Sequence, residues 1–314
     1  MTSSAGSGGD LAVVVSTVSG AGAGRRREAV LRELIGAPFR PRFFYPTSID
    51  QLRSVVAGLA ASGASHIGVS GGDGTMHHAV NALGDAPVTL VPFPGGSGND
   101  FCRGLGLDGE PETTARALRS GVTHRVDLLE VNGHRVCTVA GIGIVAATGV
   151  QMARLMAPGS VWRLPLRSLG PFAYMGAAAL RLLLAAHVTA PARVRWRETS
   201  GDWSEVTSDV HGVFLANLAT LGAGLRLPVP GQSDDGQIEV VRLPGNPRVR
   251  LLRGLARLRS GRPLPDGLID VKRAAEAEID WPGGSALVGD GEDLGRFDHF
   301  RVRALPRALQ VVSL

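Results

Sequence analysis

Two glycine-rich segments of this chain each lie between a short apolar run and a helix-like pattern. The first, GGDGT (residues 71–75), follows HIGVS, and the second, GGSGND (residues 95–100), follows VTLVPFP. Glycine allows tight turns and lets a ligand approach the main chain. A helix that begins after such a turn directs free N–H groups and a positive dipole end toward it. Each segment alone predicts either a phosphate-binding loop or a tight strand-to-helix connection.

The N-terminal part of the chain alternates between strand-like and helix-like patterns. We expect strands near residues 11–16, 42–45, 66–70 and 88–93, and helices near 25–35, 49–61 (with Ser48 as N-cap), 75–83 and up to about 120. This alternation is typical of an α/β domain with a mostly parallel sheet. Both glycine segments then leave strands at the carboxyl edge of the sheet, where open α/β sheets bind ligands. Their shared position favours a phosphate site.

Asp73 lies inside the first glycine segment. A carboxylate repels phosphate unless a cation lies between them, so a phosphate with bound Mg²⁺ explains this aspartate best. The alternative is that Asp73 caps the helix that follows. A P-loop is excluded because the chain has no GxxxxGK[ST] segment and Lys272 is its only lysine. A Rossmann dinucleotide site is disfavoured because no GxGxxG follows the first strand.

Beyond residue 122 the pattern changes to strand-like runs separated by Gly and Pro. Two runs flank Asn132-Gly133, which predicts a β-hairpin. Further strands are expected near residues 192–197, 210–218, 237–243, 274–280 and 286–288, with a helical insertion at 150–188 and a helix near 247–260. The second half is therefore expected to be mainly antiparallel β-sheet.

Composition limits the classes of function. The net charge of +5 and the pI of about 10.1 are compatible with an anionic partner. Only 5% of the residues are aromatic and no nucleic-acid-binding module is present, so nucleic acid is not expected as a partner. The two cysteines lack metal-ligand spacing, and the N-terminus lacks a signal-peptide pattern. The longest apolar region, 172–190, is interrupted by Arg181 and His187, so we expect no membrane span and a cytoplasmic location.

Found together, GGDGT and GGSGNDF resemble the catalytic domain of the diacylglycerol kinase and sphingosine kinase superfamily, in its bacterial diacylglycerol kinase branch. RVDLLEVNG, PVPGQSDDGQIEVV and GDGEDL resemble the start of that family's second domain, its acidic loop and its C-terminal Asp-Gly-Glu motif. NAD kinases share the first motif, but the second loop favours the lipid kinases.

The resemblance implies an α/β nucleotide-binding domain over residues 1–126, rejoined by residues 302–314, with an NAD kinase-like, mostly parallel sheet. It implies a β-sandwich-like domain for the acceptor over residues 127–301, with the insertion at 150–188, and an active site in the cleft between the domains. The implied reaction is transfer of the γ-phosphate of ATP to a lipid hydroxyl in the presence of Mg²⁺. The acceptor would be diacylglycerol-like or sphingoid-like.

The resemblance also assigns roles to single residues. Asp73 would bind the catalytic Mg²⁺, Asp290 would act as base, and Glu292 would support the metal or the substrate. The alternative for Asp290 is a plain Asp-Gly hairpin turn. The nucleotide would be held by ten residues: Thr17, Thr47, Gly71, Gly72, Gly74, Thr75, Gly96, Ser97, Gly98 and Asn99.

A structural Mg²⁺ is expected at the acidic loop. Its ligands would be the Asp235 side chain and the main-chain carbonyls of Gln232 and Gln237. One carboxylate makes a weak site, so a plain turn is the alternative.

Several positions depart from the family pattern. Only Ser19 and Gly20 match the segment after the first strand, and Val145 replaces a common aspartate. His77-His78 stands where the family has Asn-Glu, and we expect surface or cleft-edge histidines there rather than a metal site. These changes allow a kinase of a small non-lipid alcohol, or a nucleotide- or lipid-binding protein with weakened catalysis, as alternatives to a lipid kinase.

Residues 248–262 form a basic amphipathic pattern, with Leu251, Leu255 and Leu258 on one helical face and Arg250, Arg253 and Arg257 on another. This pattern is typical of a helix at an anionic membrane surface or of a helix that packs its leucines on a sheet. The insertion at 156–186 would line an acyl-chain pocket or form ordinary core. The expected partners are therefore ATP, a lipid alcohol and an anionic membrane surface, and a homodimer is also compatible with the sequence.

Overall fold

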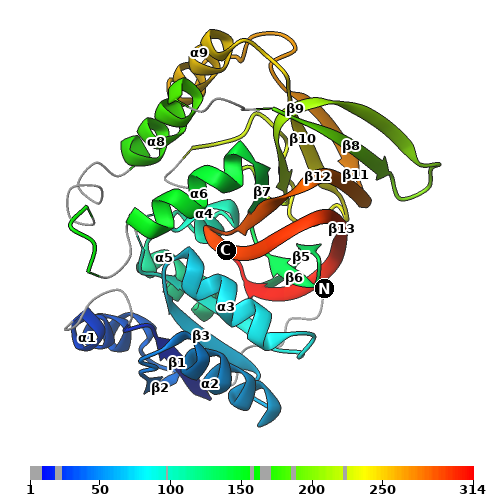
Figure 1. The fold of residues 1–314 in the computed structure, drawn as a ribbon. Helices are drawn as coiled ribbons and strands as arrows, with labels where there is room; N and C mark the ends of the chain where they lie inside the picture. The colour runs from blue at the N-terminus through cyan, green and yellow to red at the C-terminus, as the bar shows by residue number, and fades with distance from the viewer. Residues whose placement is uncertain are drawn as a thin grey trace. The chain divides into compact units, whose positions relative to one another are not determined.

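The computed structural model describes residues 9–17, 23–96, 98–155, 159–162, 171–184, 189–221 and 225–314. The chain divides into two units, shown in Figure 1. The N-terminal unit comprises Met1–Asp127 and Arg307–Leu314, and the C-terminal unit comprises Leu128–Pro306. Ser19, Gly20 and Ser97 lie outside the described residues.

A parallel sheet forms the centre of the N-terminal unit. Its order is β13-β4-β3-β1-β2, and the pairings between these neighbours are parallel. The strands are β1 (Asp10–Val15), β2 (Arg40–Phe44), β3 (His66–Gly71), β4 (Thr89–Pro94) and the last part of β13 (Glu292–Val312). Connections between parallel strands need crossovers, and the helices α1 (Ala23–Ile35), α2 (Ile49–Ala61), α3 (Asp73–Leu83), α4 (Asp100–Gly104) and α5 (Pro111–Ser120) lie between or after these strands. The predicted parallel sheet is confirmed.

Local sequence explains several helix boundaries in this unit. The Ser48 hydroxyl accepts a hydrogen bond from the Gln51 N–H at 3.2 Å, so Ser48 is the N-cap of α2 as predicted. Pro111 occupies the first turn of α5, where its missing N–H removes no helical hydrogen bond. On one side of the sheet, α1 and α5 bury Leu31, Ile35 and Leu118 against strand residues.

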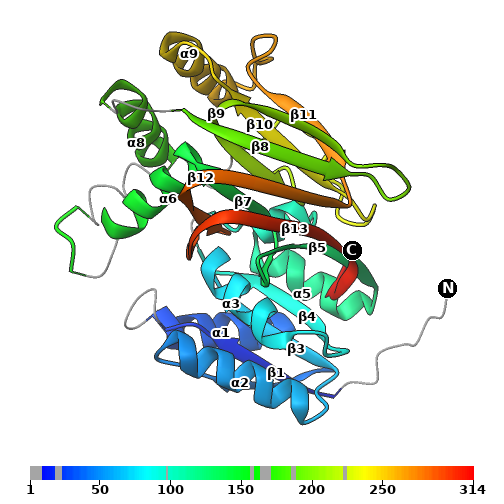
Figure 2. The same ribbon diagram turned by 45° about the vertical axis from the view of Figure 1, so that its right-hand side comes forward.

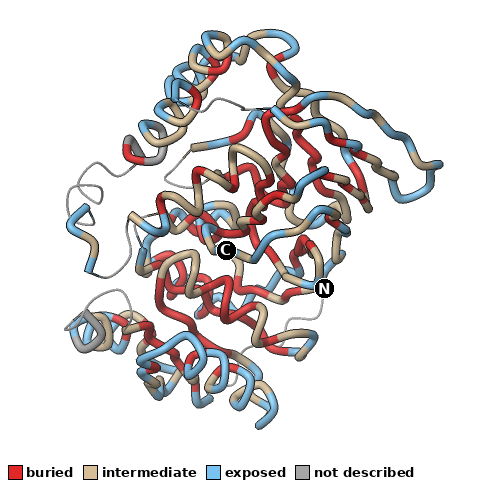
Figure 3. Tube along the Cα trace, viewed as in Figure 1, coloured by how far each residue is buried: buried red, intermediate tan, exposed pale blue. Residues whose placement is uncertain are grey.

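The C-terminal unit is built from antiparallel strands, as predicted. Its main order is β11-β10-β9-β7-β12-β13, and β8 pairs with both β9 and β12. The strands are the last part of β5 (Thr123–Val131), β6 (His134–Val136), β7 (Val139–Gly143), β8 (Ala190–Arg197), β9 (Ser204–Ala216), β10 (Ile238–Pro244), β11 (Asp270–Ala274), β12 (Glu276–Gly289) and the first part of β13. The helices are α6 (Ile144–Leu155), α8 (Pro171–Leu184) and α9 (Arg248–Arg259). Figure 2 shows β8, β9, β10 and β11 side by side, and Figure 3 shows that buried residues concentrate in the strands of each unit.

The structure differs from prediction where strands are long. The separate strands expected near 274–280 and 286–288 are one strand, β12, whose register with β13 shifts between Asp280 and Ser285. Gly283 and Gly284 within that shift have φ of 82° and 74°, which explains the apparent break in the sequence pattern. The hairpin at Asn132-Gly133 is confirmed, with φ of 47° and 84° at the two turn residues.

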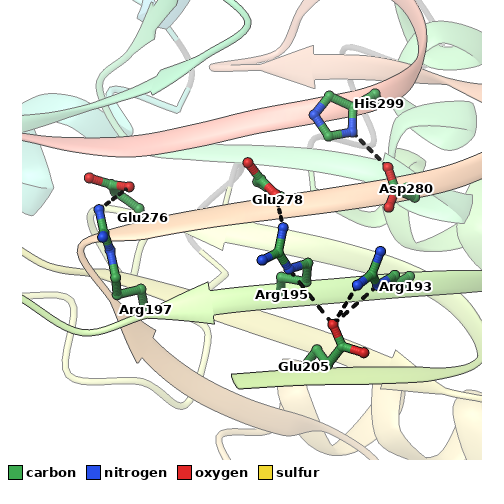
Figure 4. A network of polar contacts seen from close by, with 8 residues as sticks. All are labelled: Arg193, Arg195, Arg197, Glu205, Glu276, Glu278, Asp280 and His299. Carbon is green, nitrogen blue, oxygen red and sulfur yellow. Dashed lines mark hydrogen bonds and ion pairs between the residues drawn. The ribbon is translucent and has the colours of Figure 1, made fainter. Parts of the chain in front are cut away.

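An ion-pair ladder lies across β8, β9 and β12 (Figure 4). Arg197 faces Glu276 at 2.7 Å and Arg195 faces Glu278 at 2.6 Å, each as a direct cross-strand pair. These pairs are partly exposed, so each stabilises the fold by at most about 1 kcal/mol. These pairs help to fix the register of β8 against its neighbours. A one-residue slip of β8 would turn its arginines to the face of the sheet where Val194 is buried.

Among the described residues, no helix has both the length and the apolar character needed to cross a membrane.

Candidate active site

The carboxyl edge of the parallel sheet gathers the predicted nucleotide-binding residues of the N-terminal unit. β2 and β3 lie on opposite sides of β1, so the strand order reverses at β1. Open α/β sheets bind ligands at such a switch point. Thr17 follows β1, Thr47 follows β2, and the two glycine segments follow β3 and β4. Four loops therefore meet at one edge of the sheet.

The two glycine loops are in direct main-chain contact. The Gly95 N–H donates to the Gly71 carbonyl at 2.8 Å. A Cβ atom on Gly96 would lie only 2.6 Å from the Cα of Gly72, and one on Gly71 would lie 2.4 Å from the Thr75 hydroxyl oxygen. A side chain at Gly96 would force the two loops apart, and one at Gly71 would collide with Thr75 within its own loop. The glycines are therefore explained by this close approach, whichever ligand binds.

Asp73 does not cap α3. Gly72 is the N-cap, and Asp73 is the first residue of the helix. One Asp73 oxygen, Oδ1, accepts the Phe101 N–H at 3.2 Å, which links the two loops. The alternative in which Asp73 serves as a cap is therefore wrong.

A second carboxylate lies beside Asp73. A Cβ atom on Gly98 would lie 2.8 Å from Asp73 Oδ2 and 2.7 Å from Asp100 Oδ2, so the two oxygens approach the same point. Asp100 is buried, with 4% of its surface exposed. The sequence places Asp100 among the polar residues of the second loop but gives it no role toward a metal, although it begins α4 just as Asp73 begins α3. Two carboxylates fit Mg²⁺, which is commonly bound by one or two carboxylates together with substrate phosphates.

Cys102 lies close to these carboxylates, but its thiol is unreactive. Burial, and then the negative charge of Asp73, raise the pKa of its thiol. The protonated Sγ donates to the Pro92 carbonyl at 3.4 Å. A thiol that stays protonated is a poor nucleophile, so Cys102 is a packing residue.

Three of the predicted nucleotide-binding side chains have partners within the protein. The Thr17 hydroxyl donates to the Pro46 carbonyl at 2.7 Å, and the Thr47 hydroxyl donates to Gln51 Oε1 at 3.0 Å. Asn99, in the left-handed region with φ of 52°, accepts the Gly96 N–H on its Oδ1 at 2.8 Å. These contacts shape the loops, and a direct role of the three residues toward a nucleotide stays a prediction.

His77 and His78 are buried, with 2% and 8% of their surfaces exposed, so the expected surface position is wrong. The physical reason is that α3 packs against α2, which covers this part of α3. The two rings lie edge to face with centroids 5.2 Å apart, and His78 Nδ1 lies 3.1 Å from a guanidinium nitrogen of Arg53.

In the C-terminal unit, Asp290 and Gly291 form the two-residue turn between β12 and β13, with φ of 51° and 86°. The hairpin alternative is thus correct about the local structure. The Asp290 side chain has a further role inside the unit. Its Oδ2 accepts the Cys137 N–H at 2.8 Å, and its Oδ1 accepts the Thr138 N–H at 2.8 Å and the Thr138 hydroxyl at 2.7 Å.

Asn217 extends this buried network from the end of β9. Its side-chain amide donates to the Cys137 carbonyl at 3.0 Å, and its main-chain N–H donates to the Thr138 carbonyl at 2.8 Å. Asp290 is therefore held in one orientation by donors that are themselves fixed. Glu292, the first residue of β13, is half-buried and lies opposite Gly289.

The acidic loop does not fit a structural Mg²⁺. Asp235 Oδ1 accepts the Gln237 N–H at 2.9 Å, and its Oδ2 forms an ion pair with Arg273 of β11. An ion bound by Asp235 and the carbonyls of Gln232 and Gln237 would have to displace the guanidinium. We therefore assign the cation at this loop to Arg273.

Comparisons with known proteins show the family of this chain. Residues 10–131 match the family model "Diacylglycerol kinase catalytic domain", and residues 161–313 match "YegS C-terminal NAD kinase beta sandwich-like domain". A diacylglycerol kinase of Mycobacterium tuberculosis is 24% identical over 83% of this chain and 80% of its own length. A Pseudomonas fluorescens protein named "Probable lipid kinase YegS-like" is 29% identical over 83% of this chain and 81% of its own.

The fold is shared with solved structures. A candidate diacylglycerol kinase from Bacillus anthracis superposes with a TM-score of 0.77 over 97% of both chains, at 18% identity. A diacylglycerol kinase of the same organism gives a TM-score of 0.69 at 17% identity. With both domain models matched in order along the sequence, the chain belongs to the diacylglycerol kinase and YegS-like lipid kinase family.

Proposed function

We propose that this protein is an ATP-dependent lipid kinase that transfers the γ-phosphate to the hydroxyl of a diacylglycerol-like or sphingoid-like lipid. The observation that carries the proposal is the meeting of the Asp73 and Asp100 carboxylates beside two touching glycine loops. A loop pair of this kind offers main-chain N–H groups for phosphate, and the carboxylates supply ligands for its counter-ion. The names of the relatives support a lipid as acceptor.

In this proposal the residues of the N-terminal unit bind and orient ATP. The main chain from Gly71, the last residue of β3, through Gly72, Gly74 and Thr75 at the start of α3 faces the phosphates with N–H donors. Asp73 and Asp100 would hold Mg²⁺, which when bound neutralises charge on the phosphates. The other nucleotide-binding residues are those named from the resemblance: Thr17, Thr47, Gly96, Ser97, Gly98 and Asn99.

Asp290 is the proposed proton acceptor, and Glu292 supports it. As the acceptor oxygen forms its bond to the γ-phosphorus, the hydroxyl proton passes to the carboxylate and ADP leaves with the electrons of the broken P–O bond. Cys137 and Thr138 would orient the Asp290 carboxylate for this step. Their hydrogen bonds also compete with the substrate for the carboxylate's lone pairs. The proposed base is therefore well positioned but strongly hydrogen-bonded.

The test of this function measures ATP consumption with Mg²⁺ in the presence and absence of mixed micelles that contain a whole lipid extract. We expect consumption that depends on the lipid. Asp73→Asn should reduce it by roughly 100-fold, which is typical when one group that stabilises transition-state charge is removed. The amide oxygen that this substitution introduces can still accept the Phe101 N–H, so the loops stay linked.

Asp298→Asn, the same change at an exposed position of β13, is the matched control and should keep full activity. Consumption that ignores the lipid, or that Asp73→Asn leaves intact, would overturn the proposal.

A further inference from the structure

The helices α8 and α9 of the C-terminal unit pack against each other, and both views of the fold draw them side by side (Figures 1 and 2). Leu182 of α8 and Leu251 of α9 are buried in one cluster with Leu268. Leu251, the first residue of the predicted leucine face of α9, therefore packs inside the C-terminal unit. Outside this packing face, Arg253, Arg257 and Arg259 of α9 are exposed.

The outer side of α8 is apolar. Leu180, Leu183 and Leu184 are exposed by 50%, 56% and 73% of their surfaces. Arg248, at the start of α9, donates to the Leu183 carbonyl at 3.3 Å, which joins the two helices at this point. The next residue, Val249, is 59% exposed. Exposed leucines and a valine thus lie next to the first arginine of α9.

A hollow of about 400 Å³ opens on α9 beside Val249. It is lined by six residues, of which three are arginines and none is acidic: Pro247, Val249, Arg250, Arg253, Arg257 and Pro265. Two of the arginines are anchored by neutral acceptors. Arg250 donates to Asn246 Oδ1 at 3.2 Å and to the Asp266 carbonyl, and Arg257 donates to the Pro263 carbonyl at 3.3 Å.

Neutral anchors fix a guanidinium without cancelling its charge. Within the described part of the chain, the Arg253 side chain has neither a hydrogen bond nor an ion pair. The hollow therefore presents three positive charges, and a planar guanidinium binds phosphate oxygens in a bidentate manner. The complementary ligand is a phosphate group.

We propose that this surface docks the protein on an anionic bilayer, with a lipid head-group phosphate in the arginine hollow. Leu183, Leu184 and Val249 would enter the boundary between head groups and acyl chains, as apolar side chains of interfacial helices do. Val249, the exposed apolar residue in the lining of the hollow, favours a lipid head group over a free phosphate. The inference deepens the proposed lipid kinase by naming the surface through which it reaches its substrate, and it rests on that function in this respect.

The test is sedimentation with vesicles, without ATP. Vesicles of phosphatidylcholine that contain phosphatidylglycerol should pellet the protein at low salt, and phosphatidylcholine alone should not. A basic residue near an anionic surface changes affinity by about five-fold. Arg253→Ala combined with Arg257→Ala should therefore weaken binding by roughly 25-fold. Arg301→Ala, an exposed arginine on β13, is the matched control and should change binding less than about two-fold.

The apolar part is tested with Leu184→Ser, which should also weaken vesicle binding. Val122→Ser, at a similarly exposed apolar position of the N-terminal unit, should not. Equal binding by the double arginine variant and the Arg301→Ala control would overturn the docking surface. The docking surface would also be overturned if the protein does not bind vesicles but binds inorganic phosphate tightly, and the arginine substitutions abolish that phosphate binding.

Turnover in neutral detergent micelles separates this inference from the proposed function. If only the docking surface is wrong, the double arginine variant keeps wild-type turnover and its vesicle binding also stays at the wild-type level. If only the kinase proposal is wrong, turnover is absent in every variant while vesicle binding still depends on the arginines.

Discussion

Replacing Asp290 by Asn tests the buried network directly. Both carboxylate oxygens accept main-chain N–H groups, from Cys137 and Thr138. An amide has one oxygen and one NH₂ group, so in either orientation its NH₂ faces one of these N–H donors. The turn itself is not strained by the change, because Asn-Gly suits a turn with two positive φ angles at least as well as Asp-Gly.

The expected loss follows from these contacts. A hydrogen bond to a charged group contributes about 1.5–3 kcal/mol, and a buried donor left without an acceptor costs about 1–3 kcal/mol. The Thr138 hydroxyl can rotate to accept from the new amide, which recovers part of the loss. We therefore expect a destabilisation of about 2–3 kcal/mol, which is a large part of the roughly 5–15 kcal/mol that stabilises a typical protein. For a unit of this size the melting temperature should fall by roughly 4–12 °C.

Scanning calorimetry measures this change, with Asp298→Asn as control. Asp298 is exposed on the strand that follows the same turn, and its substitution should change stability by less than about 0.5 kcal/mol. Identical melting of Asp290→Asn and the control would refute the network. Activity must then be measured at a temperature where the variant is folded. If Asp290 is the base, the folded variant should lose activity by roughly 100-fold or more. If Asp290 is only structural, the folded variant should recover wild-type activity.

Three further changes test the site and its surroundings. Gly96→Ala should abolish ATP binding, because the new Cβ would lie 2.6 Å from the Gly72 Cα, whereas Gly58→Ala on α2 meets nothing within 4 Å and should leave titration with ATP unchanged. In the nucleotide-free Asp73→Asn variant, whose proposed Mg²⁺ site is disabled, chelation of divalent ions should not alter the melting temperature, because Arg273 supplies the cation at Asp235; a rise on adding Mg²⁺ alone to this variant would contradict this. Burial raises the pKa of Glu239 above 4.5, so the folded state favours its protonated form and loses stability as the pH rises above that value. The Glu239→Gln variant should therefore have a higher melting temperature than wild type at neutral pH and the same melting temperature below about pH 4.5. A difference in melting temperature that stays constant across this pH range would contradict the raised pKa of Glu239.

The architecture of the N-terminal unit could be predicted because its local signals agree with one another. Buried parallel strands are short apolar runs, and the helices between them carry clear N-terminal signals such as Ser48. The Asn132-Gly133 hairpin was equally predictable, since two adjacent residues specify the type of turn. In these regions each element is determined by residues close in sequence.

Contacts between distant residues could not be predicted. β12 and β13 carry alternating charges that pair across strands, as Glu278 does with Arg195, so their apolar pattern is weak. His77 and His78 are polar in sequence and buried only because α2 packs on α3. The pairing of Asp235 with Arg273 depends on strand register, which a single sequence does not reveal.

In the candidate site, too, the local motifs could be predicted and the long-range contacts could not. The glycine motifs identify both loops, but only the fold shows that Gly71 and Gly95 are hydrogen-bonded and that Asp100 approaches the same point as Asp73. Asp290 is recognisable from its motif, whereas its three donors come from residues far earlier in the chain, Cys137 and Thr138. Sequence motifs therefore identify the candidate residues, and the long-range contacts show the surroundings of each carboxylate.

The central claim is tested most directly by transfer of label from γ-³²P-labelled ATP to a panel of alcohols in mixed micelles with Mg²⁺. The panel contains diacylglycerol, monoacylglycerol, sphingosine, ceramide and water-soluble glycerol, with Asp73→Asn as the inactive control. We expect a labelled, chloroform-soluble product from a lipid alcohol that the control does not form. Transfer to glycerol alone, or no transfer to any lipid while ATP still binds, would contradict the assignment of this protein as a lipid kinase.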